Sequence, residues 1–170
     1  MKEQPVFSKG DWIVHTHYGI GQVVTRESKI FEGEEKEYLR IRTDDSEYWL
    51  LVENMDVDYI RPLASLPQIR QALGLIKNQP DVLAGDYKIR RREIGIALND
   101  VALETKVCLI RDLTERKRVK SLNITEGAVL DQLKADFLIE WSIVSGEERN
   151  HLEAKLASAL KSSARKYLGS

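Results

Sequence analysis

The chain has 170 residues, of which 42% are hydrophobic and 31% are charged. This length suits one large domain or two small ones built around a hydrophobic core. The single cysteine, Cys108, excludes an intramolecular disulfide, a cysteine-based zinc site and a C-x-x-C redox pair, and it favours a reducing cytosol. The longest apolar runs are too short to span a membrane, and no signal-peptide core follows Met1. We therefore expect a cytoplasmic protein with no membrane partner.

Charge is unevenly distributed along the chain. Residues 1–62 contain 8 Lys and Arg against 13 Asp and Glu, whereas residues 63–170 contain 18 against 14. The overall net charge of −1 argues against a nucleic-acid partner. The asymmetry instead indicates that the two halves meet different partners, one through an acidic surface and one through a basic surface.

The first sixty residues have the pattern of short β-strands. In Glu37–Arg42 apolar residues alternate with polar ones, which places Leu39 and Ile41 on one face. The expected strands are Trp12–Val14, Gln22–Thr25, Glu37–Arg42, Tyr48–Val52 and Val57–Ile60, with turns at Tyr18–Gly21, Phe31–Glu34 and Thr43–Ser46. Five short strands in this length favour a small, strongly bent barrel.

After Pro62 the apolar residues follow a helical period. The expected helices start after Ser65, Asp86, Asn99 or Asp100, Thr125, and the Ser145–Glu148 capping-box pattern. The fourth carries the apolar stripe Leu130, Leu133, Phe137, Trp141 and Val144, and the fifth carries Leu152, Leu156, Leu160 and Tyr167. The sequence thus predicts an α+β protein with a five-stranded barrel at residues 1–62, a bundle of about five helices at 63–170, and a stiff junction at Arg61–Pro62.

No catalytic constellation is convincing. His15 and His17 lie two residues apart on a strand, where they could share a metal, but no third ligand lies nearby and packing explains them better. Gly19–Gly21 lacks the third glycine and the following helix of a dinucleotide-binding motif. Cys108 lies in an apolar helical stripe, as a core cysteine does. We expect no catalytic residue, no metal and no cofactor, and hence no enzyme.

The strongest chemical signal is a basic cluster. Lys88, Arg90, Arg91 and Arg92 directly follow Tyr87, just inside a predicted helix start. Guanidinium groups there can contact phosphates, and an exposed ring beside them can wedge into a minor groove. Alternatively, Tyr87 only staples the start of the helix. The later basic run from Arg116 to Lys120 is better explained as a solvated helix end.

The acidic β half is a poor reader of nucleic acid. Its second and third strands, with Lys29–Ile30 and Tyr38–Arg42, could offer an edge to which a partner sheet adds a strand. That partner would be a protein.

The ordered motifs of the whole chain resemble the CarD family of bacterial RNA-polymerase-binding transcription regulators. The opening segments Phe7–Val14 and His17–Val23 resemble the start of the polymerase-interacting domain, which also occurs in transcription-repair coupling factors. Gly33–Leu39 resembles its second hairpin and Leu50–Asn54 its V-P-x-E-N strand end, with leucine in place of proline. Ile110–Leu113 matches a V-R-D-L stretch of the helical domain.

The resemblance implies a Tudor- or SH3-like barrel that docks on the RNA polymerase β subunit through a strand edge, and a helical domain that contacts promoter DNA without sequence specificity. Lys29 and Trp49 fall near barrel residues that face the β subunit in the family. Tyr87 falls where relatives carry a tryptophan that wedges into the minor groove at the upstream edge of the transcription bubble. Glu126–Val129 departs from the family, because relatives are more basic there.

We therefore expect a monomeric, nucleoid-associated transcription regulator that stabilises open promoter complexes. The expected polymerase-binding residues are Lys29, Ile30, Tyr38, Arg40 and Trp49, and the expected DNA-binding residues are Tyr87, Lys88, Arg90, Arg91 and Arg92. Two alternatives remain open: an adaptor that binds only proteins of the transcription or repair machinery, and a hydrolase or metalloenzyme that uses His15 and His17.

Overall fold

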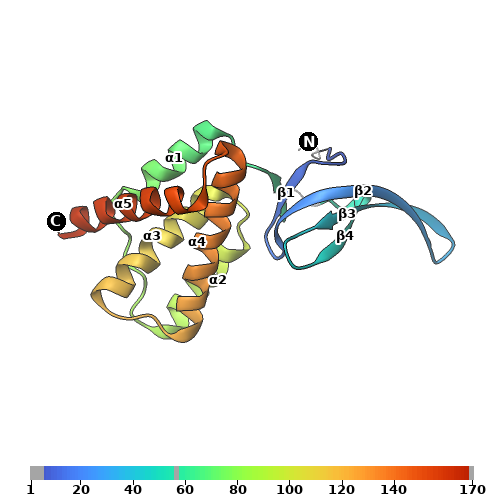
Figure 1. Ribbon diagram of the computed structural model, residues 1–170. Helices are drawn as coiled ribbons and strands as arrows, with labels where there is room; N and C mark the ends of the chain where they lie inside the picture. The colour runs from blue at the N-terminus through green and yellow to red at the C-terminus, as the bar shows by residue number, and fades with distance from the viewer. Residues whose placement is uncertain (1–5, 56–57, 169–170) are drawn as a thin grey trace. The chain divides into compact units, whose positions relative to one another are not determined.

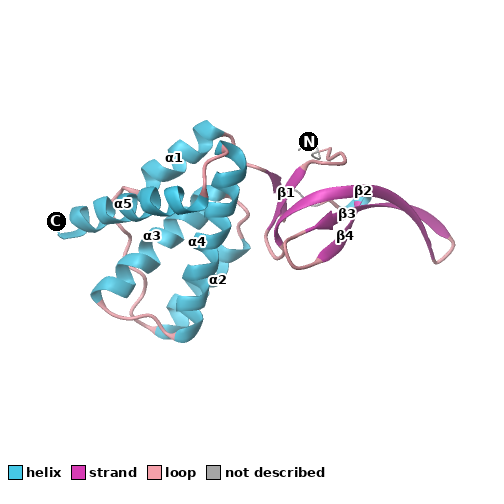
Figure 2. Cartoon of the chain, in the orientation of Figure 1, coloured by secondary structure: helices cyan, strands magenta, loops and turns pink. Residues whose placement is uncertain are grey.

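The computed structural model describes residues 6–55 and 58–168. The chain divides after Leu63 into two compact units, residues 1–63 and 64–170. All described β-strands belong to the first unit and all described α-helices to the second, as Figures 1 and 2 show. The protein is therefore α+β, as predicted.

The N-terminal unit is a five-stranded antiparallel sheet. In chain order its elements are β1 (Trp12–His15), β2 (Gly19–Phe31), β3 (Glu34–Arg42), β4 (Glu47–Leu51), the single-turn helix η1 (Val52–Asn54) and β5 (Ile60–Pro62). The strands are ordered β4-β3-β2-β1-β5 across the sheet. Leu39 and Ile41 are both buried, so the predicted alternation of β3 is confirmed. The unit's core consists of Phe7, Ile13, Val23, Leu39, Ile41, Tyr48, Met55 and Ile60.

Strand β2 differs from its predicted range at both ends. It begins at Gly19, so Gly19–Gly21 lie in the strand and not in the turn. A Cβ at Gly21 would lie 2.5 Å from Ile41 Cγ2, which explains why a glycine is needed there. At the other end β2 continues to Phe31, because Glu32 and Gly33 have φ values of 52° and 82°. Two consecutive positive φ values are typical of the tight turn of a two-residue hairpin, so β2 and β3 form one long hairpin.

The last strand begins later in the chain than the predicted Val57. Strand β5 starts at Ile60, and its pairing with β1 sets Ile60 opposite His15 and Pro62 opposite Ile13. Tyr59 lies in the preceding turn, and Val57 lies outside the described residues. Pairing with β1 therefore sets the position of this strand.

The expected free edge at Tyr38–Arg42 is wrong. This segment pairs with β2 on one side, and on the other side Tyr38 lies opposite Leu51 and Arg42 opposite Glu47 of β4. Among the described residues, β4 pairs on one side only, and so does β2 around Lys29–Ile30. Within the described residues, the strand edges without a partner include those of β4 and of the outer part of β2, together with β5 at the other edge of the sheet.

The C-terminal unit contains the expected five helices. They are α1 (Leu66–Ile76), α2 (Tyr87–Asn99), α3 (Leu103–Val119), α4 (Ile124–Ser145) and α5 (Arg149–Leu168). Ser65 caps α1 in a capping box, and the Asp86 side chain accepts from the backbone N–H groups of Lys88 and Ile89, so both predicted caps are confirmed.

Three predicted helix starts are wrong. Ala102, not Asn99 or Asp100, is the N-cap of α3, and Asp100 instead receives hydrogen bonds from the Ala102 N–H and the Thr105 hydroxyl. Asn123, and not Thr125, caps α4. The predicted box at Ser145–Glu148 does not form, because Ser145 is the last residue of α4 and Gly146 ends that helix in the left-handed conformation.

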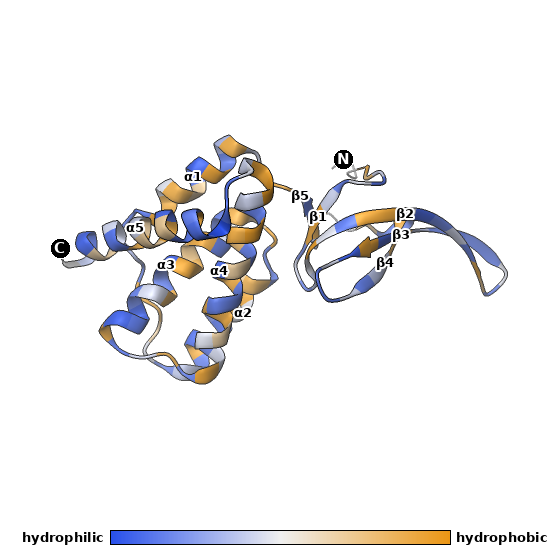
Figure 3. Cartoon of the chain, viewed as in Figure 1, coloured by the Kyte–Doolittle hydropathy of each residue, from blue (hydrophilic) through white to orange (hydrophobic). Residues whose placement is uncertain are grey.

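The predicted apolar stripes form the helical core. All five residues of the α4 stripe are buried except Val144, which is partly exposed. Figure 3 shows hydrophobic residues gathered where the helices face one another. The core comprises Ala64, Ile69, Ala72, Ile76, Ile94, Leu103, Val107, Leu109, Ile110, Leu113, Leu130, Leu133, Phe137, Leu138, Trp141, Leu152, Leu156, Ala159 and Leu160. No helix in the described part of the chain has both the length and the hydrophobicity needed to cross a bilayer.

Within this core, Arg111 fixes the loop between α1 and α2. Its side chain is 6% exposed and pairs with Asp112 at 2.8 Å, while its Nη1 donates to Leu75 O and its Nη2 lies 3.1 Å from Asp81 Oδ2. Asp112 also accepts from the Asp81 N–H at 2.9 Å. The pair therefore joins the end of α1 and the following loop to α3.

Replacing Arg111 by Met should destabilise the helical unit strongly. The change leaves the Asp112 carboxylate buried without its cation, which typically costs about 3–5 kcal/mol. Urea unfolding of the full chain, followed by circular dichroism at 222 nm, measures the loss. Lys155→Met, which breaks the exposed Lys155–Glu147 pair, is the control and should have a far smaller effect. Equal effects of the two variants would contradict this role for Arg111.

Candidate functional site

The outer face of strands β2, β3 and β4 collects four of the five residues expected to bind polymerase. Cross-strand pairing places Arg40 opposite Trp49, and Tyr38 lies two residues from Arg40 on the same face. Lys29 Nζ lies 4.3 Å from the centroid of the Trp49 ring, which is a cation–π contact. Trp49 is 44% exposed, a large fraction for an indole. We call Lys29, Tyr38, Arg40 and Trp49 the Trp49 face.

Glu27 organises this face and was missed from the sequence. Its Oε1 accepts from the Thr25 hydroxyl at 2.8 Å, its Oε2 accepts from the Trp49 indole N–H at 3.3 Å, and Arg40 Nε lies 3.3 Å from Oε1. The hydrogen bonds from Thr25 and Trp49 hold the pKa of Glu27 below its usual value despite some desolvation. Glu27 lies two residues before Lys29, and this spacing places both side chains on one face of a strand. The spacing is informative only if the strand continues beyond Thr25, the residue at which the predicted strand ends.

Ile30 does not join the Trp49 face. It follows Lys29 in the strand, so its side chain points to the opposite face of the hairpin, where it is 79% exposed. Its neighbour Phe31, on the same face as Lys29, is 60% exposed. The end of the β2–β3 hairpin therefore exposes one apolar side chain on each face, with Glu35 opposite Ile30 and Glu34 opposite Phe31.

His15 takes part in the structure of the β1–β2 turn. It is buried, and its Nδ1 accepts from the backbone N–H groups of His17 at 3.0 Å and Tyr18 at 3.3 Å. Its ring packs against Tyr18 and Tyr48, with centroids 4.6 and 5.7 Å away. Since these backbone donors occupy Nδ1, that nitrogen is not available to a metal. The described residues contain no cluster of three or more potential metal ligands from His, Cys, Asp and Glu.

Lowering the pH should destabilise the β1–β2 turn. Burial, and then the neighbouring His17, lower the pKa of His15 below its usual value of 6.5. The neutral ring therefore stabilises the folded unit above about pH 6.5, and this contribution is lost as the pH falls toward the folded-state pKa. Amide hydrogen exchange of His17 and Tyr18, corrected for intrinsic rates, should show declining protection from pH 7.5 to 5.5. In His15→Asn, whose amide oxygen accepts the same bonds without titrating, protection should stay constant. A constant protection in the parent protein would contradict this role.

Helix α2 presents the aromatic and basic cluster. Tyr87 is 51% exposed, and Lys88, Arg91 and Arg92 are all exposed. Tyr87 and Arg91 are four residues apart and so share one side of the helix, with Lys88 and Arg92 beside them. We call Tyr87, Lys88, Arg91 and Arg92 the Tyr87 surface.

Arg90 does not belong to this surface, which corrects the expected DNA-binding set. It is buried, and its Nε donates to Glu126 Oε1 at 2.5 Å. Its Nη1 donates to the carbonyls of Ala84 and Gly85 at 3.0 and 2.9 Å. Because the guanidinium is paired inside the protein, it cannot reach a phosphate.

Glu126 explains why the first turn of α4 is not basic. It is buried beside Arg90 and forms a capping box with Asn123. Burial alone would raise its pKa, but the hydrogen bonds from Arg90 and from the Asn123 N–H outweigh it, and the pKa lies below its usual value. Glu126, the acidic residue in the segment that departs from the basic pattern, is therefore the partner of Arg90.

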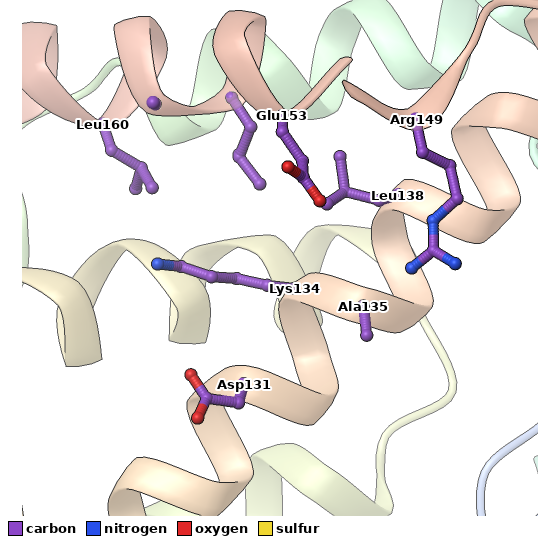
Figure 4. Close-up of a pocket in the computed structure, with 9 residues that line it drawn as sticks. Asp131, Lys134, Ala135, Leu138, Arg149, Glu153 and Leu160 are labelled. Atoms are coloured by element: carbon purple, nitrogen blue, oxygen red, sulfur yellow. The ribbon is translucent and has the colours of Figure 1, made fainter. Parts of the chain in front are cut away.

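The remaining candidate features are structural or unspecific. Burial raises the pKa of the Cys108 thiol, which keeps it protonated at neutral pH. A cleft of about 330 Å³ lies between α4 and α5, and Figure 4 shows Lys134 and Glu153 extending into it. Its rim carries two cations, Lys134 and Arg149, and two carboxylates, Asp131 and Glu153, so it favours neither charge. None of the expected site residues lines this cleft.

Comparisons with known proteins agree with the resemblance noted from the motifs. Residues 7–64 match the CarD-like/TRCF RID domain family, so that resemblance is confirmed for the N-terminal unit. A Bacillus subtilis (strain 168) protein named "Putative transcription factor YdeB" is 22% identical over 143 residues. The alignment covers 83% of this chain and 94% of that protein, and so extends well into the helical unit.

Proposed function

We propose that the chain regulates transcription by docking on RNA polymerase and contacting promoter DNA, because residues 7–64 match the CarD-like/TRCF RID domain family. The N-terminal unit would bind the β subunit, and the helical unit would meet DNA at the upstream edge of the bubble, in the cytoplasm at the nucleoid. The single observation that carries the DNA contact is the Tyr87 surface, a half-exposed ring beside three exposed cations.

The Trp49 face and the open edge of β4 support the polymerase contact. An exposed indole held by Glu27 and Lys29 offers a large, rigid contact area at little entropic cost. The open edge of β4 adjoins this face, so strand addition and side-chain contact would occur together.

Trp49→Ala should weaken binding to RNA polymerase. Central aromatic residues of an interface typically contribute about 2 kcal/mol or more, which corresponds to roughly 30-fold in affinity. Surface-immobilised core polymerase and the full chain in solution give the measurement, and a β-subunit fragment locates the contact. Ile30→Ala, on the opposite face of the hairpin, is the matched control and should change affinity less. Unchanged binding of Trp49→Ala would refute docking through this face.

The charge of the Tyr87 surface supports DNA contact without sequence readout. Exposed cations bind phosphates and release counterions, which gives salt-dependent affinity for any sequence. The aromatic ring adds a group that can stack on or wedge between bases exposed at a bubble edge. Docking on polymerase would raise the local concentration of this weak surface at the promoter.

Replacing Lys88, Arg91 or Arg92 singly by Gln should reduce the slope of log affinity against log salt concentration by about one, because each substitution removes one phosphate contact. Tyr87→Ala should shorten the lifetime of open complexes without changing that slope. Filter binding over a salt series and competitor-challenged promoter complexes give the two measurements. Arg70→Gln, an exposed cation on α1, is the control for charge. If the three Gln variants and Tyr87→Ala all matched the parent protein in salt slope and open-complex lifetime, the DNA contact would be refuted.

A second candidate, a protein-only adaptor, is favoured by two exposed isoleucines. Ile89 and Ile96 of α2 are 55% and 67% exposed and lie seven residues apart on one side of the helix. Footprinting of polymerase–promoter complexes separates the candidates, because only the DNA-contacting protein extends protection at the bubble edge.

A further inference from the structure

The three residues before Tyr87 are all hydrogen-bonded to α2: Ala84 and Gly85 bond to its side chains, and Asp86 bonds to its backbone. The carbonyls of Ala84 and Gly85 accept from Arg90 Nη1 at 3.0 and 2.9 Å. The Ala84 N–H donates to Glu93 Oε2 at 3.1 Å. Asp86 caps the helix through the N–H groups of its second and third residues. The backbone that leads into Tyr87 is therefore fixed at each of its last three positions.

Arg90 also ties this segment to another helix. Its Nε bonds to Glu126 at 2.5 Å, and the two side chains are only 8% and 6% exposed. Glu126 Oε2 in turn accepts from the Asn123 N–H at 3.1 Å. One guanidinium therefore joins the loop before α2 to the first turn of α4.

The same guanidinium lies against the Tyr87 ring. Its central carbon is 5.9 Å from the ring centroid, within the range of a cation–π contact. Tyr87 nevertheless remains 51% exposed. The ring thus has Arg90 beside it while about half of the residue's surface stays open to solvent.

We propose that Arg90 is a positioning residue that, through its buried pair with Glu126, fixes the direction in which the Tyr87 ring leaves the surface. The proposal rests on the proposed function, because it concerns how Tyr87 meets DNA. A ring already held in one orientation loses less conformational freedom on insertion into a base step than a mobile one does. Arg90 then contributes to DNA contact without touching DNA.

The test variant is Arg90→Met combined with Glu126→Gln. Arg90→Met alone would leave a buried carboxylate unpaired and destabilise the fold. Glutamine removes that charge and still suits the capping box with Asn123. Circular dichroism establishes that this double variant is folded, and Arg91→Met, which removes an exposed neighbouring cation, is the matched control.

The orientation of Tyr87 is measured first in the full chain without DNA. Three-bond couplings and ring shifts of Tyr87 should report one dominant χ1 rotamer in the parent protein and in Arg91→Met, and rotamer averaging in the double variant. A single rotamer in the double variant would overturn the proposal.

A double-mutant cycle with Tyr87→Ala then tests the effect on DNA. In the parent background the double variant should shorten open-complex lifetime by roughly two- to tenfold, the cost of ordering one side chain. In the Tyr87→Ala background it should have no further effect, and the salt slope should stay unchanged, unlike in Arg91→Met. Additive effects would indicate a general structural role and overturn the proposal.

The two hypotheses fail in different ways. If Tyr87→Ala leaves open complexes unaffected while the rotamer measurement shows averaging in the double variant, the contact of Tyr87 with DNA is refuted and positioning by Arg90 stands. If Tyr87→Ala shortens the lifetime but the double variant does not, positioning is overturned and the DNA contact stands.

Discussion

Two buried guanidinium groups hold the loop that precedes α2. Arg111 binds Leu75 O at the end of α1 and Asp81 within the loop, and Arg90 binds the carbonyls of Ala84 and Gly85 at the end of the loop. A buried charge is costly unless it is paired and fully hydrogen-bonded. Both arginines meet this condition. Arg90 bonds to Glu126 of α4 and Arg111 to Asp112 of α3, and each also bonds to the loop, so moving the loop would break hydrogen bonds to a buried guanidinium. The orientation of the Tyr87 surface depends on this constraint.

In the N-terminal unit, contacts between side chains on the surface hold the Trp49 ring in place. The Trp49 ring would be mobile on an isolated strand, but the indole N–H bonds to Glu27 and the ring lies under Lys29. Both partners come from β2, which is separated from β4 by β3. The face is therefore a product of sheet pairing across three strands. It presents an aromatic group in a defined orientation, as interface anchors require.

The two surfaces differ in charge, and this matches the two kinds of partner proposed. The Tyr87 surface carries exposed cations, whereas both cations of the Trp49 face have carboxylate partners. Lys29 lies 3.9 Å from Glu27, and Arg40 lies 3.3 Å from Glu27 and 3.9 Å from Glu47. Paired charges give orientation and specificity in a protein contact. Unpaired cations give salt-dependent attraction to a phosphate backbone.

The sequence alone determined the fold class, the five strands and five helices, and the faces that they bury, because apolar periodicity follows directly from side-chain direction in strands and helices. It also determined the caps at Ser65 and Asp86, since those bonds are local. Only the tertiary structure decided that Arg90 is internal and Arg91 external, because helical period alone does not reveal which side α4 covers. The pairing of Tyr38–Arg42 with β4 follows from the turn predicted at Thr43–Ser46. The gathering of Lys29, Glu27 and Trp49, by contrast, joins residues that are far apart in the chain. Such contacts depend on register and on long-range pairing, which local patterns do not encode.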